Sequence, residues 1–339
     1  MLNRLLLGKW VFLIGVLLNL TFVGTVPAKV FKLQMALSVY VPGSVYQFYQ
    51  QYELPRRLTE VVKNVTDHEL EIVVYPTLIK QADTVDAVRE GSVDIGVQGS
   101  MYRGDFALMN VLAFPAIIPF EACPKIQQKL MPIWNEVLKE QFDVEPLGIG
   151  YWPRQLLISK RPAATFQDLK GLKFRCHSHS LLDALRRVGG APVTMPYMEV
   201  YLALQRGAID GAASSLTGFM GGKWQEVAKY VDWWPLGNNI YFFVMNKKSW
   251  NKLPPDVQRV FREVFSNAAH ETWVASDIED QRSKAAIAKY GVTHLFPNKN
   301  EVTELSKLMA PVVAQWKERA GPRSGEVIAI LNEVLGTSY

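Results

Sequence analysis

The chain has 339 residues, of which 49% are hydrophobic and 20% charged, a composition typical of a folded globular protein and not of a disordered one. Its length exceeds one ordinary hydrophobic core and predicts two lobes. The net charge of +5 is small and dispersed, which excludes the clustered basic face that nucleic-acid binding requires. Two cysteines, Cys123 and Cys176, are too few for a disulfide framework, and their spacing leaves open whether they pair.

The N-terminus has the pattern of an export signal. A basic start is followed by an uncharged apolar run and by the small-residue pattern Val-x-Ala that ends at Ala28. This predicts a signal peptide over residues 1–28, cleaved after Ala28, and therefore a periplasmic protein. An uncleaved anchor is the alternative, because the 19 uncharged residues from Trp10 to Ala28 approach the ~20 that span a bilayer.

The first half of the remaining chain alternates strands and helices. Pro55 should kink or divide the first helix, and Gly91 should end the second. The expected elements are a strand at 30–40, a helix at about 45–64, a strand at 70–76, a helix at 83–90, a strand at 93–99 and an amphipathic helix at 125–142.

The second half contains two segments that we expect to cross between the lobes. Residues 144–160 read as a strand through a bend at Trp152-Pro153, and 239–246 read as a strand that returns to the first lobe. Between them, residues 169–215 read as strand–helix–strand–helix–strand, which implies a parallel sheet with binding at the carboxyl ends of its strands. One or two long helices at 253–290, a strand at 291–297 and further helices complete the chain.

A weak internal repeat supports two similar lobes. VDAVREGSVDIGV (85–97) and YLALQRGAIDGAA (201–213) both read as helix, glycine, small residue, β-branched residue, aspartate and strand. We expect Asp94 and Asp210 to be structural, bonding backbone amides near the preceding turn. Two equivalent lobes that face one another describe a clamshell binder. The alternative is that any two α/β units could share this pattern of helix end, glycine and strand start.

Residues 169–215 also carry a family resemblance. LKGLKFR followed by GGAPVTMPYMEVYLALQRGAIDG resembles the solute-binding proteins of tripartite ATP-independent periplasmic (TRAP) transporters. The resemblance implies an α/β, two-lobed clamshell of the periplasmic-binding-protein type, each lobe a β-sheet flanked by helices and joined by crossing strands. The expected lobes are 29–151 plus about 240–279, and 152–239 plus about 280–332, with the ligand cleft between them.

Three residues stand where such relatives contact ligand. The resemblance implies that Arg175, at the end of LKGLKFR, pairs bidentately with a substrate carboxylate, which its fork of donors suits. Arg154 matches an arginine of the preceding interlobe strand, with a structural ion pair as the alternative. Tyr197 matches an aromatic residue that either packs on the substrate or only packs at the base of the cleft.

Ser214 marks a departure from the family pattern. Relatives commonly continue Asp-Gly-Gln-Glu-Asn-Pro and hold the carboxylate with the asparagine, whereas Asp210-Gly211 is followed here by Ala-Ala-Ser-Ser. A serine hydroxyl has shorter reach and fewer donors. We therefore expect a small organic acid with an apolar or aromatic body. Candidates for the apolar wall are Trp152, Trp233, Trp234, Tyr40 and Phe114.

His177 and His179 follow Arg175 directly. We expect His177 to donate to the ligand or to make uptake sensitive to pH, and no metal site, because no third ligand is obvious for a His-x-His metal pair. No nucleophile elbow, phosphate loop, dinucleotide fingerprint or zinc motif is present. A hydrolase that uses Cys176 with His177 or His179 remains a distant alternative.

The sequence thus predicts a monomeric, non-enzymatic binding protein without cofactor. It would capture an organic acid through Arg175 and Arg154 with Ser214, Tyr197, His177 and Trp152, and deliver it to TRAP membrane subunits. The alternative with the same fold is a periplasmic sensor that reports ligand to a signalling receptor.

Overall fold

The computed structural model describes residues 28–37, 44–76 and 78–338. The predicted leader, apart from Ala28, and the candidate wall residue Tyr40 therefore lie outside the described residues. Within the described ranges, no helix combines the length and the apolar character needed to cross a membrane.

The first sheet has five strands and is built from distant parts of the chain. Its order is β2 (His68–Tyr75), β1 (Lys29–Ala36), β3 (Ile95–Gly99), β10 (Ile240–Asn246) and β4 (Val144–Tyr151). β1 runs parallel to β2 and β3, and β10 runs antiparallel to β3 and β4. Every residue of β10 is buried, because its side chains enter hydrophobic clusters on both faces of the sheet.

The second sheet has six strands, in the order β11 (Thr293–Leu295), β9 (Tyr230–Asp232), β5 (Leu156–Ser159), β8 (Gly211–Ser214), β6 (Phe174–Cys176) and β7 (Val193–Thr194). β6 is parallel to both β7 and β8. Helix α6 (His179–Arg187) connects β6 to β7, and α7 (Val200–Gln205) connects β7 to β8. The predicted strand–helix–strand–helix–strand unit is confirmed.

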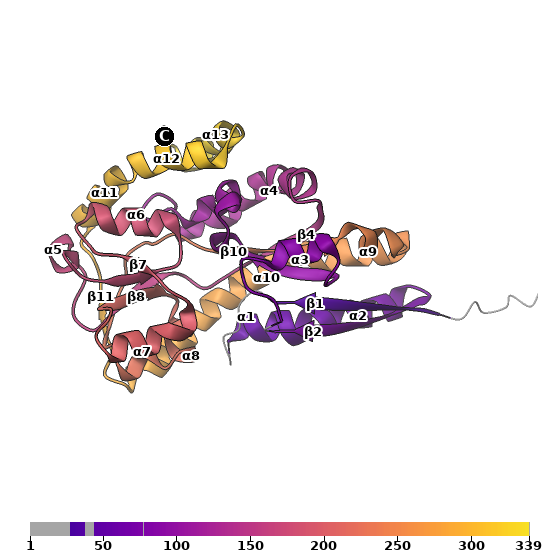
Figure 1. The fold of residues 1–339 in the computed structure, drawn as a ribbon, viewed down its shortest axis with the longest axis horizontal. Coiled ribbons are helices and arrows are strands. Elements are labelled where there is room, and N and C mark those ends of the chain that lie inside the picture. The colour runs from indigo at the N-terminus through magenta and orange to yellow at the C-terminus, as the bar shows by residue number, and fades with distance from the viewer. Residues whose placement is uncertain (1–27, 38–43, 77, 339) are drawn as a thin grey trace, which may run out of the picture.

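Two segments and one long helix join the sheets (Figure 1). Residues 152–155 lead from β4 to β5, and residues 233–239 lead from β9 back to β10. Helix α10 (Pro255–Ala288) packs on β4 of the first sheet and on α8 (Leu216–Gly221) beside the second. Two mixed sheets flanked by helices and joined by crossing segments are the predicted α/β clamshell, which is confirmed.

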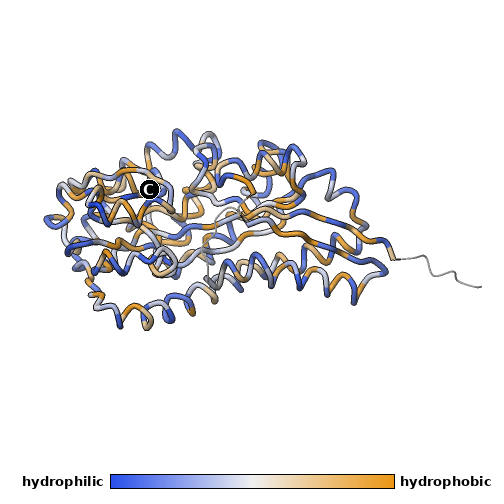
Figure 2. The backbone as a smooth tube through the Cα atoms, turned by 60° about the horizontal axis from the view of Figure 1, so that its bottom comes forward, coloured by the Kyte–Doolittle hydropathy of each residue, from blue (hydrophilic) through white to orange (hydrophobic). Residues whose placement is uncertain are grey.

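Several of the remaining helices pack directly on the sheets, and others pack on helices. Along the tube in Figure 2, hydrophilic and hydrophobic residues alternate in the helices, as expected where one face packs on a sheet. The predicted helix at 45–64 divides into α1 (Val45–Phe48), a π-helical turn (Tyr49–Glu53) and α2 (Leu54–Val65). The other helices are α3 (Thr84–Glu90), α4 (Cys123–Glu140), α5 (Phe166–Leu169), α9 (Lys247–Lys252), α11 (Lys299–Leu308), α12 (Ala310–Ala320) and α13 (Ser324–Leu335).

The C-terminal helices contact both halves of the molecule. α12 packs on α6 beside the second sheet and also on the 3-10 helical segment η3 (Gly104–Ala113), while α13 packs on α4. Residues up to 332 were expected in the second lobe alone, and these contacts bridge the two. The division of the chain into lobes by residue number stays a prediction.

The internal repeat has equivalent structure in both copies. Gly91 and Gly207 both adopt positive φ, +80° and +72°, one and two residues after the last residue of their helices. The Asp94 carboxylate accepts a hydrogen bond from the backbone N–H of Gln34 in β1, at 2.8 Å. The Asp210 carboxylate accepts one from the backbone N–H of Lys173, just before β6, also at 2.8 Å. Both aspartates bond backbone amides, as the sequence predicted, but the amides lie in or just before the neighbouring strand and not in the preceding turn, so each aspartate joins two strands.

Candidate binding site

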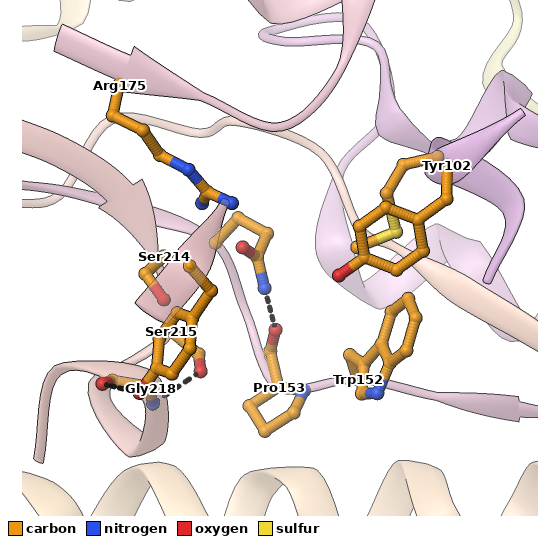
Figure 3. A pocket seen from close by; sticks show the side chains of 10 residues that line it. Tyr102, Trp152, Pro153, Arg175, Ser214, Ser215 and Gly218 are labelled. Carbon is orange, nitrogen blue, oxygen red and sulfur yellow. Dashed lines mark hydrogen bonds between the residues drawn. The ribbon is translucent and has the colours of Figure 1, made fainter. Parts of the chain in front are cut away.

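A pocket lies where the two sheets and a crossing segment meet, and it encloses about 450 Å³ including its open mouth. The segment η2 (Ser100–Tyr102), which follows β3 of the first sheet, contributes one wall, and strands and loops of the second sheet contribute the opposite wall. Figure 3 shows side chains from both walls pointing into the same space. The lining residues are Met101, Tyr102, Trp152, Pro153, Gln155, Arg175, Tyr197, Ser214, Ser215 and Gly218.

Arg175, in the middle of β6, is the charged group of this pocket. Its side chain is buried, with 5% of the residue exposed. Nε donates to the backbone oxygen of Met195 at 3.0 Å, and Nη1 donates to that of Ala213 at 3.2 Å. A guanidinium has five N–H donors, so three remain after these two bonds.

No carboxylate neutralises Arg175 among the residues that the structure describes; the polar groups that act on its charge are those of Tyr102, Cys176 and Tyr197. Burial consequently lowers its pKa from the ordinary value, although an arginine stays protonated at any physiological pH. Burying a cation that has free N–H donors and no neighbouring acid costs free energy, unless an anion from outside the chain pairs with it. The carboxylate end of a ligand would do so.

Ser214 and Ser215 lie at the end of β8, beside the guanidinium. Ser215 caps helix α8, its Oγ accepting a hydrogen bond from the N–H of Gly218 at 3.0 Å. The Ser214 Oγ makes no hydrogen bond within the described part of the chain and faces the pocket beside Arg175 (Figure 3). A Cβ at position 218 would overlap that oxygen, so glycine is what keeps the hydroxyl in place.

Aromatic rings form the walls. The rings of Trp152 and Tyr102 meet edge to face with their centroids 6.0 Å apart, and Trp152 also packs against Tyr241 at 5.2 Å. The hydroxyl of Tyr197 donates to the backbone oxygen of Gly218 at 2.6 Å, so this residue offers the ligand its ring and not its O–H. The Tyr102 hydroxyl has no partner among the described residues, and burial raises its pKa to about 12, which keeps it protonated.

Sequence reasoning missed Met101, Tyr102 and Gln155. Met101 and Tyr102 follow a strand of the first sheet and lie far from Arg175 in the sequence. Only the tertiary fold brings them next to it. Gln155 adjoins the predicted Arg154, and the backbone direction of the crossing segment decides which of the two faces the ligand. The one usable signal was that neighbouring residues of an extended segment point to different sides.

Arg154 is not brought into the Arg175 pocket. It lines a second hollow together with Phe120 and Glu121, its guanidinium lying 4.1 Å from the Phe120 ring centroid and its Nη2 3.6 Å from the Glu121 carboxylate. The Glu121 side chain is 77% exposed, so that pair contributes little stability. The charge of Arg154 also acts on the buried carboxyl of Asp280, whose pKa burial raises to about 7. Its predicted contact with ligand stays a prediction.

The two histidines diverge. Both ring nitrogens of His177 are buried without a hydrogen-bond partner, and burial together with the charge of Arg175 lowers its pKa to about 3. His177 is not among the residues that line the Arg175 pocket, and its expected contact with ligand stays a prediction. His179 is exposed and lines a different hollow, beside Arg103 and Arg319. In the described ranges, no cluster of three or more His, Cys, Asp or Glu side chains is arranged to hold a metal ion.

The two cysteines are free and buried. Burial raises the pKa of each thiol to about 12. The Cys176 Sγ donates weakly to the backbone oxygen of Phe174 at 3.7 Å. A nucleophilic cysteine needs the opposite environment, one that lowers its pKa.

The other wall candidates lie elsewhere. Trp234 is buried and donates to the Ala163 oxygen at 2.6 Å. Phe114 is buried against Trp316, and Trp233 stacks on Phe296. Of the wall candidates within the described residues, Trp152 alone lines the Arg175 pocket.

Comparison with known proteins gives one consistent family. The model of the bacterial extracellular solute-binding proteins, family 7, matches residues 49–319. The C4-dicarboxylate-binding periplasmic protein DctP of Rhodobacter capsulatus is 24% identical over 275 residues, which cover 78% of this chain and 82% of that protein.

Two solved structures show the same fold. DctP7 of Bordetella pertussis, an extracytoplasmic solute receptor that binds pyroglutamic acid, has a TM-score of 0.77 at 22% identity, covering 89% of this chain and 99% of its own. A TRAP periplasmic solute-binding protein of Desulfovibrio salexigens with bound orotic acid has a TM-score of 0.79 at 20% identity, covering 90% and 99%. Because the family model spans most of the chain, this protein belongs to the family 7 bacterial extracellular solute-binding proteins, the periplasmic receptors of TRAP transporters, and is not an enzyme.

Proposed function

We propose that this protein captures a small monocarboxylate in the Arg175 pocket and delivers it to the membrane subunits of a TRAP transporter. The observation that carries the proposal is the buried guanidinium of Arg175, which keeps three N–H donors unspent beside the Ser214 hydroxyl and has no carboxylate partner among the described residues. Two parallel N–H···O bonds to a carboxylate fit such a fork.

The composition of the pocket supports a single carboxylate on the ligand. Among the described residues that line it, Arg175 is the one charged residue, and the rest are apolar, aromatic or neutral polar. A second carboxylate would enter a buried space without a cation, which is costly. The lining therefore favours a compact ring acid, like the pyroglutamic and orotic acids of the two structural relatives, over the C4-dicarboxylates named for the R. capsulatus relative.

Capture would proceed by closure of the lobes. Tyr102 belongs to the first sheet's side, and Arg175 and Ser214 belong to the second sheet. A ligand that touches both sides binds the closed arrangement better than the open one, and therefore shifts the population toward the closed state. The membrane subunits would then recognise that closed state. We expect a monomer exported by a leader that is cleaved after Ala28.

A thermal-shift screen tests the proposal. The chain that lacks residues 1–28 is heated with a panel of small acids, because a ligand that binds only the folded state raises the melting temperature. The expected hits are monocarboxylates with a ring, and Arg175→Met should abolish them. Hits among uncharged compounds, or hits that survive in Arg175→Met, would overturn the proposal.

A further inference from the structure

Gln155 presents a fixed hydrogen-bond acceptor to the Arg175 pocket. The residue is buried, with 6% exposed, and it lines the pocket from the crossing segment. Its Nε2 donates to the backbone oxygen of Pro153 at 2.7 Å, the bond drawn beside Pro153 in Figure 3. Elsewhere in the described part of the chain, nothing donates to its Oε1.

The neighbouring carbonyl determines the orientation of this amide. With the amide turned over, Oε1 would lie 2.7 Å from the Pro153 oxygen, and two acceptors at that distance repel. Nε2 therefore faces Pro153, and Oε1 is left for the pocket.

Each polar group of the pocket thus has a distinct function toward a ligand. Arg175 offers only donors, and the hydroxyls of Tyr102 and Ser214 can either donate or accept. Gln155 Oε1 can only accept. A ligand carboxylate would occupy the donors of Arg175, and a carboxylate oxygen next to Oε1 would be repelled, so a ligand atom that contacts Oε1 of Gln155 must carry a hydrogen.

We infer that Gln155 selects acids that carry an N–H or O–H donor beside the carboxylate, on the neighbouring ring or chain atom. This inference rests on the proposed function and refines it. When the lobes close, Gln155 Oε1 loses its hydrogen bond to water. A ligand without a donor gives it no hydrogen bond in return, so the site rejects analogues that lack the donor. Gln155 is then the specificity-determining residue, while Arg175 provides affinity for any carboxylate.

Matched pairs of acids that differ in one atom test the inference. Pyrrole-2-carboxylate and furan-2-carboxylate are planar rings of equal size, with N–H and ring oxygen beside the carboxylate respectively. Pyroglutamate and its lactone, 5-oxotetrahydrofuran-2-carboxylate, are the saturated pair. Titration calorimetry on the chain lacking residues 1–28 should show that the N–H member of a pair binds at least about tenfold more tightly than its oxygen counterpart.

Gln155→Met keeps the length of the side chain and removes the acceptor. It should reduce that ratio to about one by weakening the N–H acid alone, and retained binding of the oxygen acid would show that the pocket still folds. Gln155→Glu should abolish binding of every acid, because its carboxylate would compete for Arg175. Equal affinities within both pairs for the wild type, or a ratio that survives in Gln155→Met, would overturn the inference and leave the carboxylate proposal standing. Failure of all four acids to bind would overturn both.

Discussion

Replacing Arg175 with methionine should remove most of the affinity for a carboxylate ligand while leaving the fold intact. The guanidinium has three N–H donors to offer, and a carboxylate engages two of them as a fork. A hydrogen bond to a charged group contributes about 1.5–3 kcal/mol, and deleting one partner of a buried charge pair costs about 2–5 kcal/mol. The two bonds of the fork together amount to about 3–6 kcal/mol, which overlaps the second estimate at about 3–5 kcal/mol. This corresponds to a dissociation constant about 10²- to 10⁴-fold weaker.

The same substitution should not reduce the stability of the ligand-free protein. Methionine removes a buried cation that lacks an acid partner within the described residues, which is favourable. It also leaves the carbonyls of Met195 and Ala213 without their donor, which is unfavourable by a similar amount. The melting temperature without ligand should therefore match or exceed that of the wild type, and the ligand should no longer raise it.

Two further variants sharpen this experiment. Arg175→Lys keeps the charge but has no fork, so its affinity should also fall by more than tenfold. Arg154→Met removes the other arginine that the sequence singled out, which lies outside the pocket, and its affinity should stay within about threefold. Titration calorimetry and thermal unfolding measure both quantities. An Arg175→Met protein that binds within threefold of the wild type would refute the reasoning.

Three other outcomes follow from the structure. Tyr102→Phe should weaken ligand binding by about three- to tenfold and leave the melting temperature unchanged. Tyr197→Phe loses the bond to Gly218, so it should lower the unfolding free energy by about 1 kcal/mol and hardly change the affinity. The opposite pattern in calorimetry and thermal unfolding would contradict these roles. Gly218→Ala should displace the Ser214 hydroxyl and reduce affinity by about tenfold, as calorimetry would show. Asp280 binds its proton in the folded state up to about pH 7 against an ordinary value of 3.8, so the unfolding free energy should fall as pH rises from about 4 to 7, by a few kcal/mol at most. Asp280→Asn should flatten that slope in urea titrations at each pH, and an unchanged slope would show that Asp280 is not its source.

The architecture could be predicted from the sequence because its signals are local. Gly91 and Gly207 end helices by a backbone conformation that other residues adopt at a cost, and Asp94 and Asp210 each bond the nearest neighbouring strand. The glycines act within a few residues of their helices, whereas the aspartate bonds join neighbouring strands from residues 60 and 37 positions apart in the chain. The bridging position of α12 and α13 depends instead on which apolar surfaces remain uncovered once both sheets have formed, and no local pattern encodes that.

The site divides along the same line. Arg175 could be predicted because it lies one residue before the carboxyl end of β6, which runs parallel to β7 and β8, and such ends form the binding edge of a sheet. Arg154 and Gln155 are adjacent in a segment without regular structure, and which of them faces the ligand depends on how residues 152–155 pass from β4 to β5. The bond from Gln155 to the carbonyl of Pro153, two residues earlier, holds the glutamine on the pocket side. Arg154 then lies over the ring of Phe120. The crossing segment therefore places a neutral acceptor, and not a second cation, in the lining of the pocket that holds Arg175.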